Sequence, residues 1–388
     1  MSELLNGRWA ETKEALLEGL NGTKKSVMSV TLENTRKYLM ESPTAGATSA
    51  GNVATLNRVI LPVIRRVMPT VIANELVGVQ PMTGPVGQIH TLRVRYADSS
   101  SGAGVVAGEE ALSPFKIAEA YSGNEASPAK AASTATLEGA AGKRMSIQIL
   151  KQTVEARTRK LSARWTFEAA QDAQAQQGID IEAEVMAALA QEITAEIDQE
   201  ILASLASLAG SATEAYDQSA VSGTATFVGD EHAALAVQIN RVSNLIAQRT
   251  RRGAGNWAVV SPFALTILQS ATTSAFARTT EGTFEAPTNT KFVGTLNSAM
   301  KVYVNTYATD ATDVLIGYKG SSESDAAAFY CPYIPLMSSG VVLDPATFEP
   351  VVSFMTRYGY VELTNTASSL GNAADYLGKV SISNVSFK

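Results

Sequence analysis

The helical stretch in residues 162–208 constrains the fold more than any other part of the sequence. It predicts a short helix that breaks at Gly178 and one long helix from Ile181 to Leu208. Asp180 is the expected N-cap and Gly210 the expected stop. The long helix would measure about 40 Å at 1.5 Å per residue. Its large apolar residues recur every four positions, at Val185, Leu189, Ile193, Ile197, Ile201 and Leu205. This stripe winds around the helix and predicts a spine that passes over several neighbours.

Length and charge limit the class of protein. At 388 residues the chain exceeds the usual size of one core, so we expect two lobes. No apolar run approaches the roughly 18 residues that span a bilayer, and the N-terminus does not resemble a secretory signal, so we expect no membrane contact. The net charge of −6 argues against specific nucleic-acid binding, because proteins that hold nucleic acid on their surface are normally basic.

Residue types that carry catalysis are scarce. The single cysteine, Cys331, excludes an internal disulfide, and its apolar surroundings predict a buried inert thiol. The two histidines, His90 and His232, are too few for a histidine-rich metal site, and we expect structural roles for both. The spine carboxylates have the spacing of a solvated or interface face, and no phosphate-binding loop or serine-nucleophile motif is present. We therefore expect no catalytic residue, cofactor or metal site, and no enzyme.

The first 55 residues predict an arm joined by a tether. Residues 3–20 favour an amphipathic helix, and residues 26–39 a second helical piece. Small and polar residues at 42–51 are typical of a linker. We therefore expect residues 1–55 to lie outside the core.

Two strand patterns bracket a segment of residues 99–142 that is dominated by Ala, Ser and Gly. The first strand alternates four side chains on one face, His90, Leu92, Val94 and Tyr96, with Arg93 and Arg95 on the other. The second resumes the alternation at Met145, Ile147 and Ile149 and continues through Arg157, Arg159 and Lys160. Such a two-stranded arm is marginally stable alone, so we expect it to lie on another copy of the chain.

A second lobe is expected after the spine. Asp230 would cap a helix that ends in the basic group Arg249, Arg251 and Arg252. A strand at 257–260 follows, and then Ser261 and Pro262 open another helix. Further strands are expected at 301–307 and 314–318, whereas residues 341–363 and 380–387 should return to the sheet of the spine lobe. The fold class is α+β.

Several multi-residue passages resemble, in the same order, the major capsid proteins of T-even-type tailed bacteriophages. They include residues 61–69 (LPVIRRVMP), 78–85 (GVQPMTGP) and 165–172 (WTFEAAQD). Shorter passages are 178–184 (GIDIEAE), 253–257 (GAGNW), 317–320 (GYKG) with Asp325 and Ala326, 331–333 (CPY) and 356–359 (TRYG). The resemblance covers about residues 56–95 and 160–363.

The resemblance implies the Hong Kong-type phage capsid fold, with an N-terminal arm, an extended loop, a peripheral lobe with a long spine helix, and an axial lobe. The implied bounds are 1–55 for the arm and tether, 56–87 for the start of the peripheral lobe, 88–160 for the extended loop, 161–224 for the spine, 225–335 for the axial lobe and 336–388 for the return to the peripheral sheet. Copies of such a chain assemble into hexameric and related capsomers of an icosahedral shell. That shell encloses packaged double-stranded DNA in the virion, and vertex, portal, scaffold or decoration proteins are further expected partners.

The resemblance also singles out individual residues. Leu39-Met-Glu41 is similar to the site at which relatives lose an N-terminal propiece, so Glu41 is the candidate maturation cleavage site. The candidate assembly contacts are the basic residues Arg93, Arg95, Arg157, Arg159, Lys160, Arg251 and Arg252. Two alternatives stay open at this point: a shell protein of an encapsulin-like compartment or another phage structural protein on the same fold, and a hydrolase whose site is not visible in the sequence.

Overall fold

The computed structural model describes two compact units and most of the chain between residues 22 and 385. The described residues are 22–41, 72–100, 104–109, 111, 121–123, 131–139, 141–177, 180–221, 228–250, 252–271, 276–278, 291–297, 299–308, 313–323, 325–347, 349–363 and 373–385, with Trp9, Lys13, Glu14 and Leu17. Most of the helix expected at 3–20, the tether at 42–51 and the passage at 61–69 lie outside them.

Unit 1 comprises Met1–Gly87, Val154–Ser204 and Ala328–Val361. Its sheet contains β1 (Gly78–Val79), β4 (Arg157–Arg164), β11 (Ala328–Ser338), β12 (Val342–Leu343) and β13 (Pro350–Glu362). The strand order is β1-β11-β13-β12, and β4 also pairs with β13. The antiparallel β4–β13 register runs from Val351 opposite Arg164 to Tyr358 opposite Arg157. Alternate residues of β13, including Val352, Phe354 and Tyr358, are buried, as expected for a strand with one face on a core.

The spine helix is α8 (Ile181–Leu208), which has the predicted ends. Asp180 accepts hydrogen bonds from the N–H groups of Glu182 (3.1 Å, to its side chain) and Glu184 (3.2 Å, to its carbonyl), which confirms it as the cap. Gly210 has a φ of +67°, the left-handed conformation that ends a helix at glycine. Five residues of the predicted stripe are buried, and Val185 is half-buried. The shorter helix before the spine is α7 (Phe167–Gln177).

Helix α2 (Gly22–Glu41) is the second helical piece expected in the arm, and it packs within unit 1. Val27, Met28 and Leu32 are buried, and the Asn34 side chain donates to the carbonyls of Met82 (2.6 Å) and Tyr333 (3.1 Å). This part of the predicted arm therefore belongs to a core, contrary to the sequence prediction. The reason is that one helix face is apolar enough to be covered by residues far away in the sequence.

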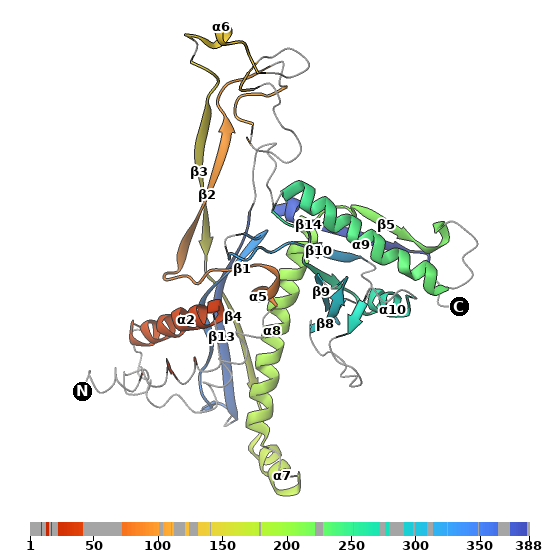
Figure 1. Cartoon of the computed structure of the whole chain (residues 1–388). Coiled ribbons are helices and arrows are strands. Elements are labelled where there is room, and N and C mark those ends of the chain that lie inside the picture. Colours follow the sequence, from red (N-terminus) through yellow and green to blue (C-terminus); the bar gives the residue numbers. More distant parts are fainter. Residues whose placement is uncertain are drawn as a thin grey trace. The chain divides into compact units, whose positions relative to one another are not determined.

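The predicted two-stranded arm is the hairpin of β2 (Val86–Tyr96) and β3 (Met145–Glu155). Figure 1 shows the two long strands side by side, with the short helix α6 (Thr134–Leu137) at their far end. The Ala97 N–H donates to the Arg144 carbonyl at 2.9 Å where the hairpin opens into the connecting segment. Residue His90 is exposed, although the strand pattern had placed it on an apolar face.

Unit 2 comprises Gln88–Thr153, Leu205–Ala327 and Glu362–Lys388. Its seven-stranded sheet has the order β5-β14-β10-β6-β9-β8-β7. The strands are β5 (Glu214–Asp217), β6 (Trp257–Val260), β7 (Phe276–Arg278), β8 (Lys291–Leu296), β9 (Met300–Val304), β10 (Val314–Gly317) and β14 (Leu377–Ser383). The helices that pack on this sheet are α9 (Val228–Thr250) and α10 (Pro262–Ser270), and short 3-10 turns lie at Gln218–Ala220 and Ala373–Tyr376.

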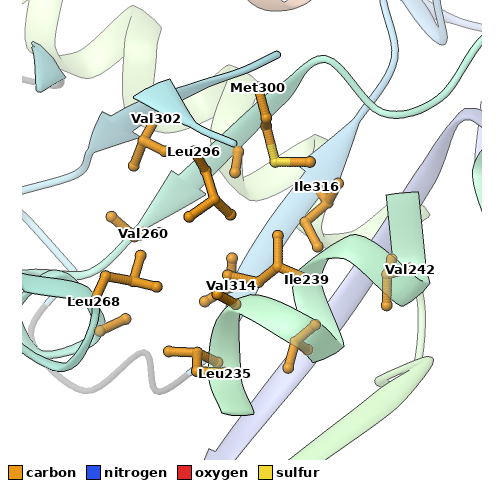
Figure 2. Packing of buried hydrophobic residues seen from close by; sticks show 14 of the residues in the cluster. Leu235, Ile239, Val242, Val260, Leu268, Leu296, Met300, Val302, Val314 and Ile316 are labelled. Carbon is orange, nitrogen blue, oxygen red and sulfur yellow. The ribbon is translucent and has the colours of Figure 1, made fainter. Parts of the chain in front are cut away.

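The core of this second sheet forms between its strands and the two helices α9 and α10. Figure 2 shows Ile239 of α9 beside Val314 and Ile316 of β10, with Leu235 and Val242 of the same helix in the same buried cluster. Further buried members come from β6, β8, β9 and α10: Val260, Leu296, Met300, Val302 and Leu268. Ser261 caps α10 as predicted, because its hydroxyl accepts from the Ala264 N–H at 3.2 Å. Helix α9 begins at Val228, so Asp230 lies in its first turn and is not its cap.

Two strands lie in a different sheet from the one expected. β14 was expected in the spine lobe, but it pairs with β10 and β5 in the sheet of unit 2. β11 was expected mainly in the axial lobe, but it belongs to the sheet of unit 1. Alternation of apolar residues identifies a strand and its buried face but carries no information on its partner strand. The α+β class is as predicted.

Candidate assembly surfaces

A row of exposed apolar side chains follows one face of β3. Met145, Ile147 and Ile149, hereafter the β3 strip, are 49%, 68% and 66% exposed. Successive residues of a strand point to opposite faces, so these three share a face. Their neighbours Ser146 and Gln148 are exposed as well, so both faces of this part of β3 are open within the chain. Three adjacent large apolar residues are unusual on the surface of a soluble monomer and indicate a contact with another molecule.

The far end of the hairpin has a small core of its own. Tyr96, Val105, Ala111 and Tyr121 are buried together, and the two tyrosine rings lie 4.5 Å apart. The Tyr121 hydroxyl donates to the Arg144 carbonyl at 2.5 Å. Hydrogen bonds from Arg144 hold the pKa of Asp98 below its usual value. The composition of residues 99–142, dominated by Ala, Ser and Gly, gave no indication that Tyr121 packs against Tyr96.

In unit 1, one arginine holds the sheet to the spine helix. Arg159 of β4 donates from Nε to the Tyr358 hydroxyl (2.6 Å) and from Nη1 to Glu196 (2.6 Å), and its Nη2 is paired with Glu200. The Tyr358 hydroxyl in turn donates to Glu200 at 2.5 Å. These four residues are called the Arg159 clasp. Arg159, Tyr358 and Glu200 form a closed ring of hydrogen bonds, and Glu196 adds a further bond to the arginine. Such charge-assisted hydrogen bonds are stronger than neutral ones.

The clasp forms because its members are neighbours on regular elements. Glu196 and Glu200 are four residues apart on α8 and therefore share one helix face. Arg159 is paired with Thr356 in the β4–β13 register, so its side chain lies on the same sheet face as Tyr358, two residues along.

The clasp shifts the protonation equilibria of its members. Partial burial alone would raise the pKa of Glu200, but the hydrogen bonds from Arg159 and Tyr358 outweigh it and lower that pKa. Burial and the hydrogen bond to Glu200 raise the pKa of Tyr358 to about 12. At neutral pH the Arg159 guanidinium is therefore bound to an ionised Glu200 and a neutral Tyr358 phenol.

The other basic candidates occupy different environments. Arg157 and Lys160 are exposed on β4 on either side of the clasp arginine. Arg95 is half-buried, and its Nε has no hydrogen-bond partner among the described residues. The side chain of Arg93 and the whole of Arg251 lie outside the described part of the chain. Arg157 and Lys160 are therefore exposed in this part of the sheet, whereas Arg95 is not.

Arg252 and Glu41 have specific placements. Arg252 pairs with Asp325 at 2.6 Å in unit 2, next to the Tyr376 hydroxyl, which also donates to Asp325 (3.3 Å). Burial alone would lower the pKa of Arg252, but neighbouring Tyr376 and Asp325 raise it. Glu41 is the last residue of α2, so the candidate cleavage site lies at a helix end, and its side chain is outside the described residues.

Close packing explains why glycine stands in two of the sequence passages singled out above. A Cβ on Gly317 would collide with the ring of Trp257, and one on Gly359 would collide with Val154. Asn256 lies next to Trp257 in the same passage. Its side chain donates to the Lys319 carbonyl (2.6 Å) and accepts from the Lys319 N–H (3.0 Å). These passages therefore serve packing within each unit.

The helices in the described ranges are too short or too polar to span a bilayer. No group of three or more His, Cys, Asp or Glu side chains there is placed to hold a metal ion. Cys331 is buried, and burial raises the pKa of its thiol to about 11, which leaves little reactive thiolate at neutral pH.

Comparison with known proteins decides the family. The family "Major capsid protein Gp23" matches residues 53–141 and 112–382 of the chain. The chain belongs to the Gp23 family of major capsid proteins. The major capsid protein of Vibrio phage KVP40 is 30% identical over 426 residues, which cover 85% of this chain and 81% of the relative. That of Enterobacteria phage T4 is 30% identical over 407 residues, which cover 81% and 76%.

The fold agrees with membership of the Gp23 family. A solved structure titled "Mycobacterium phage Bobi" has a TM-score of 0.50 at 12% identity and covers 80% of this chain and 90% of that chain. The α+β fold is therefore the Hong Kong-type fold of tailed-phage capsid proteins, as the resemblance implied. The chain is a structural protein of a tailed-phage virion, and its place is the capsid. The compartment alternative is not favoured.

Proposed function

We propose that the chain builds the icosahedral shell around packaged double-stranded DNA by self-association into hexameric and related capsomers, with no chemical reaction of its own. The β3 strip is the observation that carries the mechanism. An isolated two-stranded hairpin is marginally stable in water. Burying exposed apolar surface contributes roughly 25 cal/mol per Å², so covering this strip with a second copy stabilises both the contact and the hairpin.

Charge favours the spine region of that second copy as the surface that receives the hairpin. Lys151, Arg157 and Lys160 are exposed along β3 and β4. The helices α7 and α8 contain no Lys or Arg. Besides Glu196 and Glu200, which bind Arg159, four of their acids are exposed: Glu168, Asp172, Glu184 and Glu192. Opposite charges on two surfaces orient them as they approach. The basic candidates then act between copies at Arg157 and Lys160, whereas Arg159 acts within its own chain.

Packaged DNA would be enclosed by such a shell without being bound tightly. The net charge of −6 gives the wall no general attraction for phosphate groups. Vertex, portal, scaffold or decoration proteins remain expected partners of the assembled shell, in line with the capsid role of the family.

The test removes the apolar character of the β3 strip. The double variant Ile147→Ser with Ile149→Ser should keep the far-ultraviolet circular dichroism of the wild type but form no closed shells in negative-stain microscopy. The matched control is Val237→Ser, because Val237 of α9 is 64% exposed but lies outside the hairpin. Uniform shells from the double variant, at wild-type yield and size, would refute the proposed role of the hairpin.

A further inference from the structure

Asp198 is a carboxyl group buried inside unit 1. It is only 2% exposed, on a face of α8 where Thr194, Ile201 and Leu202 are buried as well. Its Oδ1 accepts a hydrogen bond from the backbone N–H of Ile72 at 2.9 Å. An ionised carboxylate is rarely buried unless a cation or several donors compensate its lost hydration.

The hydrogen bond to Ile72 fixes where the chain joins the spine helix. Ile72 precedes the short helix α5 (Ala73–Leu76), and no side chain next to it in sequence caps that helix. Asp198 supplies the acceptor from a point 126 residues away. Ile72, Ala73 and Leu76 are themselves buried, so the segment that Asp198 holds is shielded from water.

No cation of the described residues compensates Asp198. The nearest carboxylates on α8, Glu196 and Glu200, are two residues away on either side, which places them on the opposite face of the helix. Arg159 is bound to those two and to Tyr358. Tyr330 of β11 is a neutral phenol whose pKa is raised in part by Asp198. The cation of β13, Arg357, lies over the Tyr333 ring and does not pair with Asp198. Accordingly, burial raises the pKa of Asp198 to about 7, and only the Ile72 N–H opposes this shift.

We propose that Asp198 is a proton-operated latch, which holds residues 72–76 on the spine helix when its carboxyl group is neutral and releases them to water when it is ionised. The direction of the pH effect follows from the linkage between protonation of Asp198 and closure of the latch. The closed state keeps the proton up to about pH 7, whereas a hydrated carboxyl loses it near pH 4, so the closed state weakens as the pH rises through that interval and is weakest above it. The latch would make the conformation of unit 1 respond to pH, independently of any contact between copies.

Hydrogen exchange of the full-length protein tests the latch. Protection of the amides in residues 72–77, corrected for the intrinsic exchange rate, should fall at least about tenfold between about pH 5.5 and pH 8. In Asp198→Asn, which keeps an oxygen acceptor but cannot ionise, the protection should be the same at both pH values. The control Asp180→Asn removes an exposed acid that caps α8 and should retain the wild-type pH dependence.

Each result decides the proposal. The proposal is overturned if amide protection in the wild type does not change with pH. It is also overturned if protection in Asp198→Asn depends on pH as strongly as in the wild type. Infrared spectroscopy of the wild type gives a second test that requires no variant to fold. The band of a protonated carboxyl group should persist above about pH 6 and disappear near neutral pH, whereas loss of all such bands below about pH 5 would contradict the latch.

Discussion

Arg159 lies where three elements of unit 1 meet, on β4 between the spine helix and β13. Its side chain is 31% exposed, and those of Glu196 and Glu200 are 44% and 40% exposed. Solvent therefore screens each pair, and an exposed ion pair alone contributes at most about 1 kcal/mol. The clasp should contribute more than a single pair, because the guanidinium is held by three acceptors at once and loses little further freedom with each added bond.

We predict that Arg159→Ala lowers the free energy of unfolding by about 1–2 kcal/mol at neutral pH, after allowance for solvent screening. Urea unfolding, followed by tryptophan fluorescence, measures the change. The matched control is Lys160→Ala, because Lys160 is exposed on the next position of the same strand and should change stability by less than about 0.5 kcal/mol. Equal effects of the two substitutions would show that the clasp adds nothing.

Acid should remove the difference between Arg159→Ala and the wild type. The clasp lowers the pKa of Glu200, so it stabilises the native state above the ordinary glutamate pKa of about 4.5. That stabilisation is lost as the pH falls from about 4.5 through the lowered native value. Urea unfolding of both proteins at several acidic pH values tests whether their difference in stability shrinks as the pH falls. A difference that stays constant down to about pH 3 would mean that packing of the arginine stem, and not its charge, accounts for the effect.

At the scale of elements, the sequence predicted what depends on local pattern. The ends of α8 follow from Asp180 and Gly210, and the bounds of β6 from its apolar run, because caps and turns act on adjacent residues. The partners of β14 could not be predicted, since it alternates equally well for either sheet. The clasp was missed for the same reason: Arg159 and Tyr358 are separated by 199 residues, and only the β4–β13 register brings them together.

Gly359 of β13 gives a prediction at this scale. An added Cβ would collide with Val154 and lie 3.2 Å from the Glu155 carbonyl, so the backbones of two strands would have to separate. We expect Gly359→Ala to destabilise unit 1 by about 1–3 kcal/mol, the usual cost of overpacking. The control is Gly87→Ala, whose Cβ would meet only the flexible end of Met82 at 3.5 Å. Thermal unfolding of both variants compares them, and equal midpoints would disprove the steric argument.

At the scale of the whole molecule, charge is unevenly distributed along the chain. No Lys or Arg occurs between Arg164 and Arg241, a stretch that contains α7 and α8 with all their acids. The basic residues of the hairpin and β4 come before that stretch. If the hairpin of one copy lies on the spine region of the next, this separation makes every such contact a pairing of opposite charges. It also disfavours spine–spine contacts, because their acids repel each other.

Salt should therefore slow assembly. The Debye length falls from about 10 Å at 0.1 M to about 3 Å at 1 M salt, so we expect the assembly rate, followed by light scattering, to fall several-fold over that range.

Reversing charges on the two surfaces tests whether they meet. Glu184→Lys with Glu192→Lys should slow assembly at low salt, and adding Lys151→Glu with Lys160→Glu should restore part of the rate. The exposed acid Glu138 lies outside α7 and α8, so Glu138→Lys serves as the control. The restoration is the decisive result, because loss of assembly alone could come from damage to the spine helix, whereas recovery by opposite charges on the hairpin requires the two surfaces to meet. A rate that is independent of salt, together with no recovery in the fourfold variant, would leave the apolar strip as the main contact and remove charge from the mechanism.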